Sequence, residues 1–390
     1  MMKKKYYLED FLYKEVSHKY NIKMLDLMIL IIILILGLLI RYNLFYFQSE
    51  DYIQNLQHWF ATIKSNGGIF GIKYLVGNYT PPYTYMLALL TYLPFSSLTS
   101  IKLLSVLFDI LLSLLVGLIV FCIKNNKNGA ISAFAITFLL PTVVVNSSMW
   151  AQCDSIISFF IILSLYCFIR EHPAMGCFSF GIAIAIKIQS IFLAPLLLFL
   201  WIDKRINFKH LLFIPLAYLL SVVPSALAGG NYLEALTVAY WQVTTTATNL
   251  SFNCANFWAP LSSVTAPKIA KAGTCFALSI TFLTAYYIVS KKPKLDQNKI
   301  ILISLFYLLL IHFFLPHMHE RYYFYAEIVS IIYLFIEPKK FYYTIIISSV
   351  SLYSYLPFLF NTEIISLSIL ALAILFILCD LGYNLLKAIE

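Results

Sequence analysis

The chain has 390 residues, of which 61% are hydrophobic and only 12% are charged, and its formal net charge is +9. Ordinary soluble domains do not contain apolar runs as long and as numerous as those found here. The basic residues lie in short loops rather than on one face, so they indicate membrane topology, and no nucleic acid is expected as a partner.

The first 23 residues are polar and basic, and no short apolar region with a small-residue cleavage site precedes the first long apolar run. We therefore expect residues 1–23 to form a cytoplasmic N-terminus followed by an uncleaved membrane helix. Similar apolar runs recur up to the C-terminus, and about 20 such residues cross a ~30 Å hydrocarbon core as a helix. We predict an all-α polytopic membrane protein, a single domain over residues 1–390, with about twelve spanning helices at 24–40, 101–123, 129–147, 155–170, 173–187, 190–201, 210–228, 272–290, 298–315, 323–336, 341–357 and 364–386.

One further apolar stretch, residues 83–95, is short and follows Pro81 and Pro82. Both features favour a helix that lies along the membrane surface over one that spans the membrane. With this choice and a cytoplasmic N-terminus, 19 of the 27 Lys and Arg residues fall on the cytoplasmic side. Because basic loops favour the cytoplasm, we predict that both termini are cytoplasmic.

This topology gathers the polar stretches of the chain on the outer face of the membrane. They are an outer loop over 41–100 with interfacial helices, a turn over 148–154, a long loop over 229–271 and a turn over 316–322. A transporter that works by alternating access more often places such groups near the bilayer midplane. Polar groups in outer loops indicate instead an enzyme that works at the outer surface.

Two acidic residues, Glu50 and Asp51, follow the first helix and precede an amphipathic stretch that contains Trp59. Ser49, Glu50 or Asp51 could each accept hydrogen bonds from the first amides of an interfacial helix. A carboxylate here could also be a general base, which takes a proton from a hydroxyl that attacks an electrophile. The residues alone leave both roles open.

Trp150, Gln152 and Asp154 follow the third predicted helix. A tryptophan at a membrane boundary is often an anchor, and Asp154 is placed to cap the helix expected from residue 155. Together, however, the three side chains suit a sugar, because an indole stacks on a pyranose face while Gln and Asp hydrogen-bond its hydroxyls. Both interpretations stay open.

Lys187 lies between two short apolar runs, at the predicted outer turn of a helical hairpin. Its side chain either reaches up to the membrane surface or binds an anion. Lipid phosphate is the anion most available at that depth, so we expect Lys187 to bind phosphate.

The segment 317–321 places His317, His319, Glu320 and Arg321 between two long apolar runs. Imidazoles and a carboxylate suit zinc, but the spacing H-x-H-E lacks the i, i+4 arrangement of H-E-x-x-H. The guanidinium of Arg321 matches phosphate, and histidines donate hydrogen bonds to phosphate oxygens. We expect a site for a phosphate headgroup without a metal ion, and a purely structural polar network is the alternative.

These residues fall in six motifs along the chain, which are S-x-DY-x-x-x-L-x-x-W (49–59), NYTPPY (78–83), WAQCDS (150–155), KIQSIFLAP (187–195), NLSFNCANFW (249–258) and HMHERYY (317–323). In this order they resemble the GT-C superfamily of polytopic glycosyltransferases, which use polyprenyl-phosphate sugars. The chain most resembles the bacterial relatives of the second GPI-anchor mannosyltransferase. The dolichyl-phosphate-glucose glucosyltransferases have a similar H-x-H-E-K where this chain has residues 317–321.

The resemblance implies a GT-C-type fold and Asp51 as the catalytic base, since the family motif places an Asp immediately before a Tyr, here Tyr52. It also implies that 83–95 lies along the membrane surface. The chain departs from the family pattern where the usual W-G-Q, K-P-Q and N-A-P-N appear as Trp150-Ala151-Gln152, Lys187-Ile188-Gln189 and Asn253-Cys254-Ala255-Asn256.

The reaction that the resemblance implies is the transfer of a hexose, of mannose or glucose type, from a polyprenyl-phosphate donor to a hydroxyl of a glycan, glycolipid or wall polymer, with inversion. No cofactor or metal is expected, because phosphate is already a competent leaving group. The expected roles are Asp51 as catalytic base, Lys187, Arg321, His317 and His319 as donor-phosphate ligands, and Glu50, Tyr52, Trp150, Gln152, Asp154, Gln189, Asn253, Asn256 and Glu320 as sugar or acceptor ligands.

Two other classes of function remain open from the sequence. A transporter or flippase of lipid-linked glycans needs polar groups along a path to the cytoplasmic side, and Asp109 and Asp380, inside apolar runs, are too few to mark one. A non-catalytic membrane subunit would tolerate replacement of Asp51.

Overall fold

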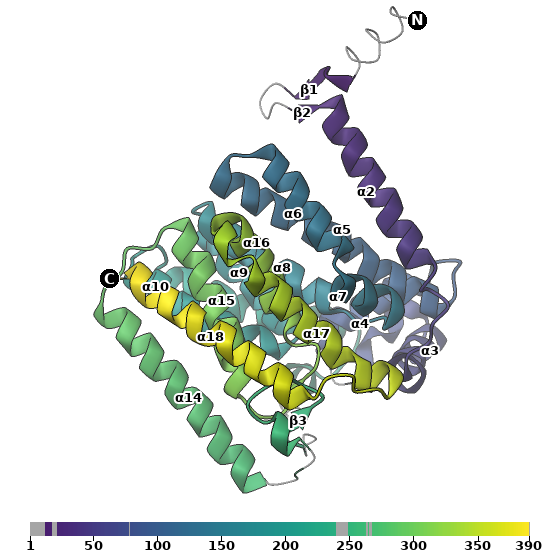
Figure 1. Cartoon of the computed structure of the whole chain (residues 1–390). Coiled ribbons are helices and arrows are strands. Elements are labelled where there is room, and N and C mark those ends of the chain that lie inside the picture. Colours follow the sequence, from purple (N-terminus) through teal and green to yellow (C-terminus); the bar gives the residue numbers. More distant parts are fainter. Residues whose placement is uncertain are drawn as a thin grey trace, which may run out of the picture.

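The computed structural model describes residues 12–17, 22–77, 79–238, 249–262, 264 and 267–389. Parts of the predicted N-terminus and of the long loop 229–271 therefore lie outside the described residues. Within these ranges nearly all of the secondary structure is helical, as predicted, and the helices form one bundle (Figure 1). The strands are short and form an antiparallel pair, β1 (Glu15–Ser17) with β2 (Ile22–Lys23), and a parallel pair, β3 (Ser251–Phe252) with β4 (Met318–His319).

Seven helical segments of the described residues are long and apolar enough to cross a membrane. They are α2 (Met24–Tyr42), α5 (Ser97–Lys124), α11 with α12 (Phe208–Leu211, Phe213–Leu227), α14 (Pro267–Ser290), α15 (Gln297–Phe314), η7 with α17 (Pro338–Lys340, Tyr342–Phe360) and α18 (Leu367–Ile389). An eighth candidate consists of α6 (Lys127–Leu139) with α7 (Pro141–Val144) and η4 (Val145–Met149), which are bent by 48° at their junction. By length and composition, these segments fit a multi-pass membrane protein.

The other four predicted spans are shorter helices of 13 to 16 residues. A straight helix of 16 residues rises only about 24 Å, which is less than the ~30 Å thickness of the hydrocarbon core. The long helices alone thus account for seven or eight crossings rather than for about twelve. These four are α8 (Asp154–Ile169), α9 (Pro173–Ile186), η5 with α10 (Ile188–Leu193, Ala194–Ile202) and α16 (Phe324–Ile336).

The bend between α6 and α7 has a local cause in the sequence. Pro141 follows Leu140, and a residue before proline is disfavoured in the helical region. Leu140 accordingly has φ −58° and ψ 127°, which ends α6 before α7 begins at Pro141. The bend redirects the chain before the turn at residues 150–153, where candidate site residues lie.

Burial separates central helices from peripheral ones. The most apolar stretch of α15 is 72% buried, against 17% in α2 and 22% in α14. A helix that is hydrophobic on all sides and buried belongs to the core, whereas an apolar helix with exposed sides suits contact with lipid. Figure 1 shows α2 (purple) and α14 (green) at opposite edges of the bundle.

A buried ion pair attaches α2 to the rest of the bundle. The Nε and Nη2 of Arg41 donate to Oδ2 of Asp109 over 3.1 and 2.9 Å. Ser147 and Ser155 also donate to the Asp109 carboxylate, and neither Arg41 nor Asp109 is accessible to more than 1%. Asp109 is therefore a partner in helix packing.

The basic loops meet at one end of the bundle. Lys127 pairs with Asp26 over 2.6 Å, and Lys124 donates from Nζ to the Ile336 carbonyl over 3.2 Å. These contacts join the start of α2, the turn between α5 and α6, and the end of α16, which leads into the basic segment 338–340. The candidate site residues described below lie at the opposite ends of these helices.

The predicted outer loop over 41–100 contains only short helices before α5 begins. They are η2 (Tyr52–Leu56), α3 (Gln57–Ser65), η3 (Gly68–Lys73) and α4 (Pro81–Leu90). The 10 residues of α4 rise about 15 Å, so this helix is too short to cross the membrane. Its length agrees with a non-spanning segment at 83–95, and its position along the membrane surface stays a prediction.

The parallel pair β3–β4 brings two of the predicted outer segments together. Ser251 lies opposite Met318, and Phe252 lies opposite His319. The amide of Glu320 also donates to the carbonyl of Phe252 over 3.0 Å. The middle of the long loop 229–271 is thereby fixed beside the turn at 316–322.

Candidate functional site

A half-buried carboxylate, that of Asp51, joins three segments of the chain that are far apart in sequence. Its Oδ2 accepts hydrogen bonds from Nε1 of Trp150 over 2.9 Å and from Nε2 of Gln152 over 2.8 Å. The Oε1 of Gln152 accepts a hydrogen bond from Nη1 of Arg321. The guanidinium of Arg321 also lies 5.4 Å from the centre of the Trp150 ring. The structure thus brings together four of the residues expected to form the site.

The turn that carries Trp150 and Gln152 is held by hydrogen bonds to its backbone. The Oγ of Ser49 donates to the carbonyl of Trp150 over 2.9 Å, and the Oγ of Ser105 donates to that of Gln152 over 2.7 Å. Between them Ala151 has φ +64°, a left-handed conformation that favours glycine. This is the position at which the W-G-Q motif carries glycine. The turn therefore has a backbone conformation that favours glycine at this position, although its residue is alanine.

A second carboxylate, that of Asp154, lies fully buried next to this cluster. Its Oδ1 accepts from Nζ of Lys187 over 3.0 Å, and its Oδ2 accepts from Nδ2 of Asn146 over 2.9 Å. The anion beside Lys187 is therefore a protein carboxylate. Asp154 makes no capping hydrogen bond at the start of α8, where Cys153 is the cap residue. Of the roles left open for Asp154, helix capping is not observed.

Aromatic rings surround the ammonium group of Lys187. Its Nζ lies 4.8 Å from the centre of the Tyr322 ring and 6.0 Å from that of Tyr79. The Nε2 of Gln189 donates to the hydroxyl of Tyr322 over 2.9 Å. Tyr79 and Tyr322 were not among the expected site residues. Both lie inside quoted motifs, NYTPPY and HMHERYY, so their motif positions are the signal that could have identified them.

Glu320 contacts both Arg321 and His319. Its Nε lies 3.4 Å from Oε1 of Glu320, and Nδ1 of His319 lies 3.8 Å from Oε2 of the same carboxylate. Burial alone would lower the pKa of Arg321, but the carboxylates of Asp154 and Asp51 raise it well above its ordinary value. Burial alone would raise the pKa of Glu320, but the neighbouring His319 and Arg321 hold it below its ordinary value. Arg321 is thus cationic and Glu320 anionic at neutral pH.

Two of the expected site residues, His317 and Asn256, contact backbone groups outside the Asp51 cluster. The Nδ1 of His317 lies 2.5 Å from the carbonyl oxygen of Asn249, and its ring is therefore engaged with the backbone. Asn256 is fully buried, and its Oδ1 accepts from the amide of Trp258 over 3.0 Å. Neither side chain has a hydrogen bond to the Asp51 cluster in the described part of the chain.

Asn253 and His319 line a cavity of about 330 Å³ beside Glu320. The His319 ring stacks on Phe252, with ring centres 4.6 Å apart and an angle of 8° between the planes. Asn253 has φ +50°, a left-handed conformation that asparagine tolerates. This cavity provides an aromatic surface together with amide and carboxylate groups.

The residues around Asp51 differ in their contacts. Glu50 is exposed and accepts from Nε2 of Gln54 over 2.6 Å. Tyr52 is buried, and its hydroxyl hydrogen-bonds Oγ of Ser97 over 2.8 Å, which anchors the outer loop to α5. The amide of Tyr52 donates to Oγ of Ser49 over 3.2 Å. Of the three residues proposed for this capping contact, the structure shows Ser49.

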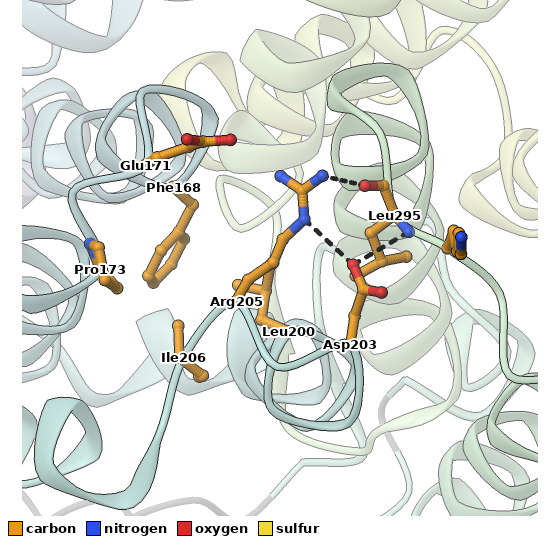
Figure 2. A pocket seen from close by; sticks show the side chains of 9 residues that line it. Phe168, Glu171, Pro173, Leu200, Asp203, Arg205, Ile206 and Leu295 are labelled. Carbon is orange, nitrogen blue, oxygen red and sulfur yellow. Dashed lines mark hydrogen bonds and ion pairs between the residues drawn. The ribbon is translucent and has the colours of Figure 1, made fainter.

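A separate cavity of about 470 Å³ lies at the basic end of the bundle (Figure 2). There Nε of Arg205 donates to Oδ2 of Asp203 over 3.1 Å, and the amide of Leu295 donates to the same oxygen over 3.1 Å. These bonds tie two loops together (Figure 2). Asp154 and this cavity lie at opposite ends of α8, whose 16 residues rise about 24 Å. The cavity is therefore not part of the Asp51 cluster.

The zinc alternative at residues 317–321 depends on several ligands meeting at one point. Among the residues that the structure describes, no group of three or more His, Cys, Asp or Glu side chains is arranged to hold a metal ion. His317 and His319 instead contact Asn249 and Glu320. The described cluster at these positions is a network of hydrogen bonds and ion pairs.

No model of a known protein family matches the sequence, and no curated protein matches it. A function must therefore be inferred from the residues of the site.

Proposed function

We propose that the protein is a membrane glycosyltransferase of the GT-C type. It transfers a hexose, of mannose or glucose type, from a polyprenyl-phosphate donor to a hydroxyl of a glycan, glycolipid or wall polymer. The observation that carries the proposal is the meeting of Asp51 with Trp150, Gln152 and Arg321 at one end of the bundle. These residues belong to three of the six motifs on which the resemblance depends.

The carboxylate of Asp51 is suited to act as a general base. Both of its hydrogen bonds go to Oδ2, and in the described ranges Oδ1 accepts none. In the proposed reaction Oδ1 takes the proton of the acceptor hydroxyl while the hydroxyl oxygen bonds to the anomeric carbon. The bond from that carbon to the phosphate oxygen breaks, and its electron pair leaves with the polyprenyl phosphate. Attack from the opposite side inverts the anomeric centre.

Arg321 is a better candidate than Lys187 for binding the donor phosphate. Its Nε and Nη1 are engaged by Glu320 and Gln152, whereas Nη2 has no hydrogen-bond partner among the described residues. Negative charge grows on the phosphate as it departs, and a fixed guanidinium stabilises that charge. Lys187 already neutralises Asp154, so we propose that it positions this carboxylate for sugar hydroxyls.

The proposed topology has twelve membrane crossings. The eight long candidates and the four shorter apolar helices together give this number. Short helices can cross where the bilayer thins around a protein or where flanking side chains snorkel to the membrane surface. We propose that the basic end faces the cytoplasm, because basic loops favour that side, and that the site faces outward in the cell membrane.

Purified protein incubated with candidate polyprenyl-phosphate hexoses and acceptors tests the proposal. We expect release of polyprenyl phosphate and loss of this release in Asp51→Asn, which keeps the size of the side chain and removes its basicity. Loss of a positioned general base typically costs about 10²–10⁴-fold in rate. The measurement is the initial rate of polyprenyl phosphate release at saturating donor.

Glu50→Gln is the matched control for this variant. Glu50 is exposed and hydrogen-bonded to Gln54, so the change should reduce the rate by less than about threefold. Asp51→Asn with near-normal transfer would exclude Asp51 as the base. Near-normal transfer in Asp51→Asn together with loss in Glu50→Gln would move the base to Glu50.

A further inference from the structure

A second polar region lies inside the bundle, where α7, α16 and α17 meet. Its centre is Glu327 of α16, which is fully buried. The Oγ1 of Thr142 donates to Oε1 of Glu327 over 2.5 Å. The other carboxyl oxygen, Oε2, has no hydrogen-bond partner in the described part of the chain. Nothing in the proposed transfer reaction uses this carboxyl group.

Hydroxyl groups of α17 face this carboxyl group. Ser348, Ser351 and Tyr355 are spaced by three and four residues, which places them on one face of the helix. Ser348 and Ser351 lie within hydrogen-bonding reach of the Glu327 carboxyl group, and Tyr355 lies within such reach of Ser351 and Asn146. None of these contacts has the geometry of a hydrogen bond, so the hydroxyls of all three residues and Oδ1 of Asn146 have no hydrogen-bond partner among the described residues. Buried polar groups are almost always hydrogen-bonded, so a seam of five such oxygens points to a bound species.

The charged groups on the helices around Glu327 already have partners. Arg41 is paired with Asp109 over 2.9 Å, and Lys187 is paired with Asp154 over 3.0 Å. On the neighbouring helices, Lys102 and Lys124 of α5 donate to backbone carbonyls, Lys127 of α6 pairs with Asp26, and His312 of α15 contacts Cys254. No cation of the described residues pairs with Glu327, and an isolated buried carboxylate costs too much free energy to stay charged.

We infer that Glu327 and the hydroxyls of α17 form a binding site for a small monovalent cation, either a proton or Na⁺. Either ion neutralises the single carboxylate. A divalent ion would leave an uncompensated positive charge in an apolar interior. Oxygen atoms of carboxyl, hydroxyl and amide groups are suitable partners for a hard cation, and they equally accept and donate the hydrogen bonds of a protonated carboxyl group.

The seam leads from Glu327 toward the outer end of the bundle. The Tyr355 ring packs edge-on against Trp150, with ring centres 5.1 Å apart. Asn146, which contacts Tyr355, donates to Asp154. Tyr355 and Asn146, both fully buried, thus link the Glu327 region to the residues around Asp51 and Asp154.

Infrared difference spectroscopy of the purified full-length protein tests for the proton. A protonated Glu327 gives a carboxylic carbonyl band that shifts in D₂O and is absent from Glu327→Gln. Glu337→Gln, at the residue directly after the same helix, is the matched control and should keep the band. Tyr355→Phe should shift the band without removing it, and Tyr353→Phe should leave it unchanged. The Tyr355→Phe comparison stays informative if Glu327→Gln does not fold.

Thermal unfolding in NaCl and in choline chloride at equal ionic strength tests for Na⁺. Bound Na⁺ should raise the unfolding midpoint by roughly 3 °C or more, and Glu327→Gln should abolish this difference. A carbonyl band without a sodium effect assigns the proton, and a sodium effect without the band assigns Na⁺. If neither is found, Glu327 is charged without a bound cation and the inference is overturned.

Discussion

Glu50 and Asp51 are adjacent in sequence, and their side chains have separate surroundings. Adjacent residues of a helix point about 100° apart, so the two carboxylates cannot readily reach the same hydroxyl. Asp51 accepts hydrogen bonds from Trp150 and Gln152, whereas Glu50 faces solvent and Gln54. A carboxylate with two fixed donors is held in place, which a positioned base requires.

A change at Arg321 tests its proposed role with the donor phosphate. Arg321→Ala should lower the rate of polyprenyl phosphate release by about 10²-fold, because a charge that stabilises the leaving group is lost. Arg321→Lys should restore the rate only in part, since lysine lacks the planar fork. The initial rate of polyprenyl phosphate release is measured with and without a chelator, and the chelator should leave it unchanged. A rate that a chelator abolishes and one divalent ion restores would favour a metal site.

The left-handed Ala151 allows a prediction about the turn of the site. The left-handed conformation costs a residue with a Cβ about 1–2 kcal/mol, and Ala151→Gly removes this strain. Glycine loses more conformational entropy on folding, which offsets about 0.5–1 kcal/mol of the gain. We therefore expect unchanged or slightly higher thermal stability and retained activity. Ala151→Val should lower both, since a β-branched residue is disfavoured at φ +64°. A large loss in Ala151→Gly would contradict the left-handed turn.

Among the helices, α2 shows how an exposed element is attached to the bundle. Its most apolar stretch is only 17% buried, so packing alone fixes it weakly. Near its end Arg41 reaches Asp109 of α5 and also donates to the carbonyl of Phe138 over 2.8 Å. Lys102 of α5 donates to the Phe47 carbonyl over 2.6 Å, which fixes the chain after α2. These contacts hold the segment that leads directly to Asp51.

Removing one member of this ion pair should be costly. Asp109→Leu leaves the Arg41 charge buried without its partner, and such changes cost about 3–5 kcal/mol. The double variant Arg41→Leu with Asp109→Leu should recover most of that stability, because no buried charge remains. Thermal unfolding of detergent-solubilised protein measures the effect. Equal losses in the single and double variants would show that packing, rather than charge, holds α2.

Across the whole molecule, the basic loops and the candidate site residues lie at opposite ends of the bundle. Lys124, Lys127 and the segment 338–340 lie at one end, and Asp51, Asp154 and Arg321 lie at the other. This arrangement agrees with a protein whose basic loops face the cytoplasm and whose site faces outward. We predict that the end with the basic loops inserts toward the cytoplasm.

Cysteine labelling in intact cells tests the direction of insertion. Lys64→Cys in α3 and Lys292→Cys in the loop after α14 form a matched pair, because both lysines are exposed. On a background without the native cysteines, an impermeant thiol reagent should label position 64 at once and position 292 only after permeabilisation. The reverse pattern would put the site in the cytoplasm and exclude an outer-face reaction.

The sequence by itself determined the all-α class and the positions of the apolar helices, because a long apolar run is stable in a bilayer only as a helix. It also placed Asp51, Trp150, Gln152 and Arg321 in polar stretches between those helices. It did not determine how many helices are long enough to span. That number depends on where helices break, as they do at Pro141.

Only the tertiary structure decided which polar side chains are partners. Asp51 and Trp150 are 99 positions apart, and no spacing rule connects residues at such a distance. The same holds for Lys187, whose expected partner was a phosphate and whose observed partner is Asp154. Glu327 lies within a predicted helix, and its isolation from every described cation depends on how α7, α16 and α17 pack. Charge pairing in an apolar interior is decided by three-dimensional neighbours, because burial makes an unpaired charge too costly to keep.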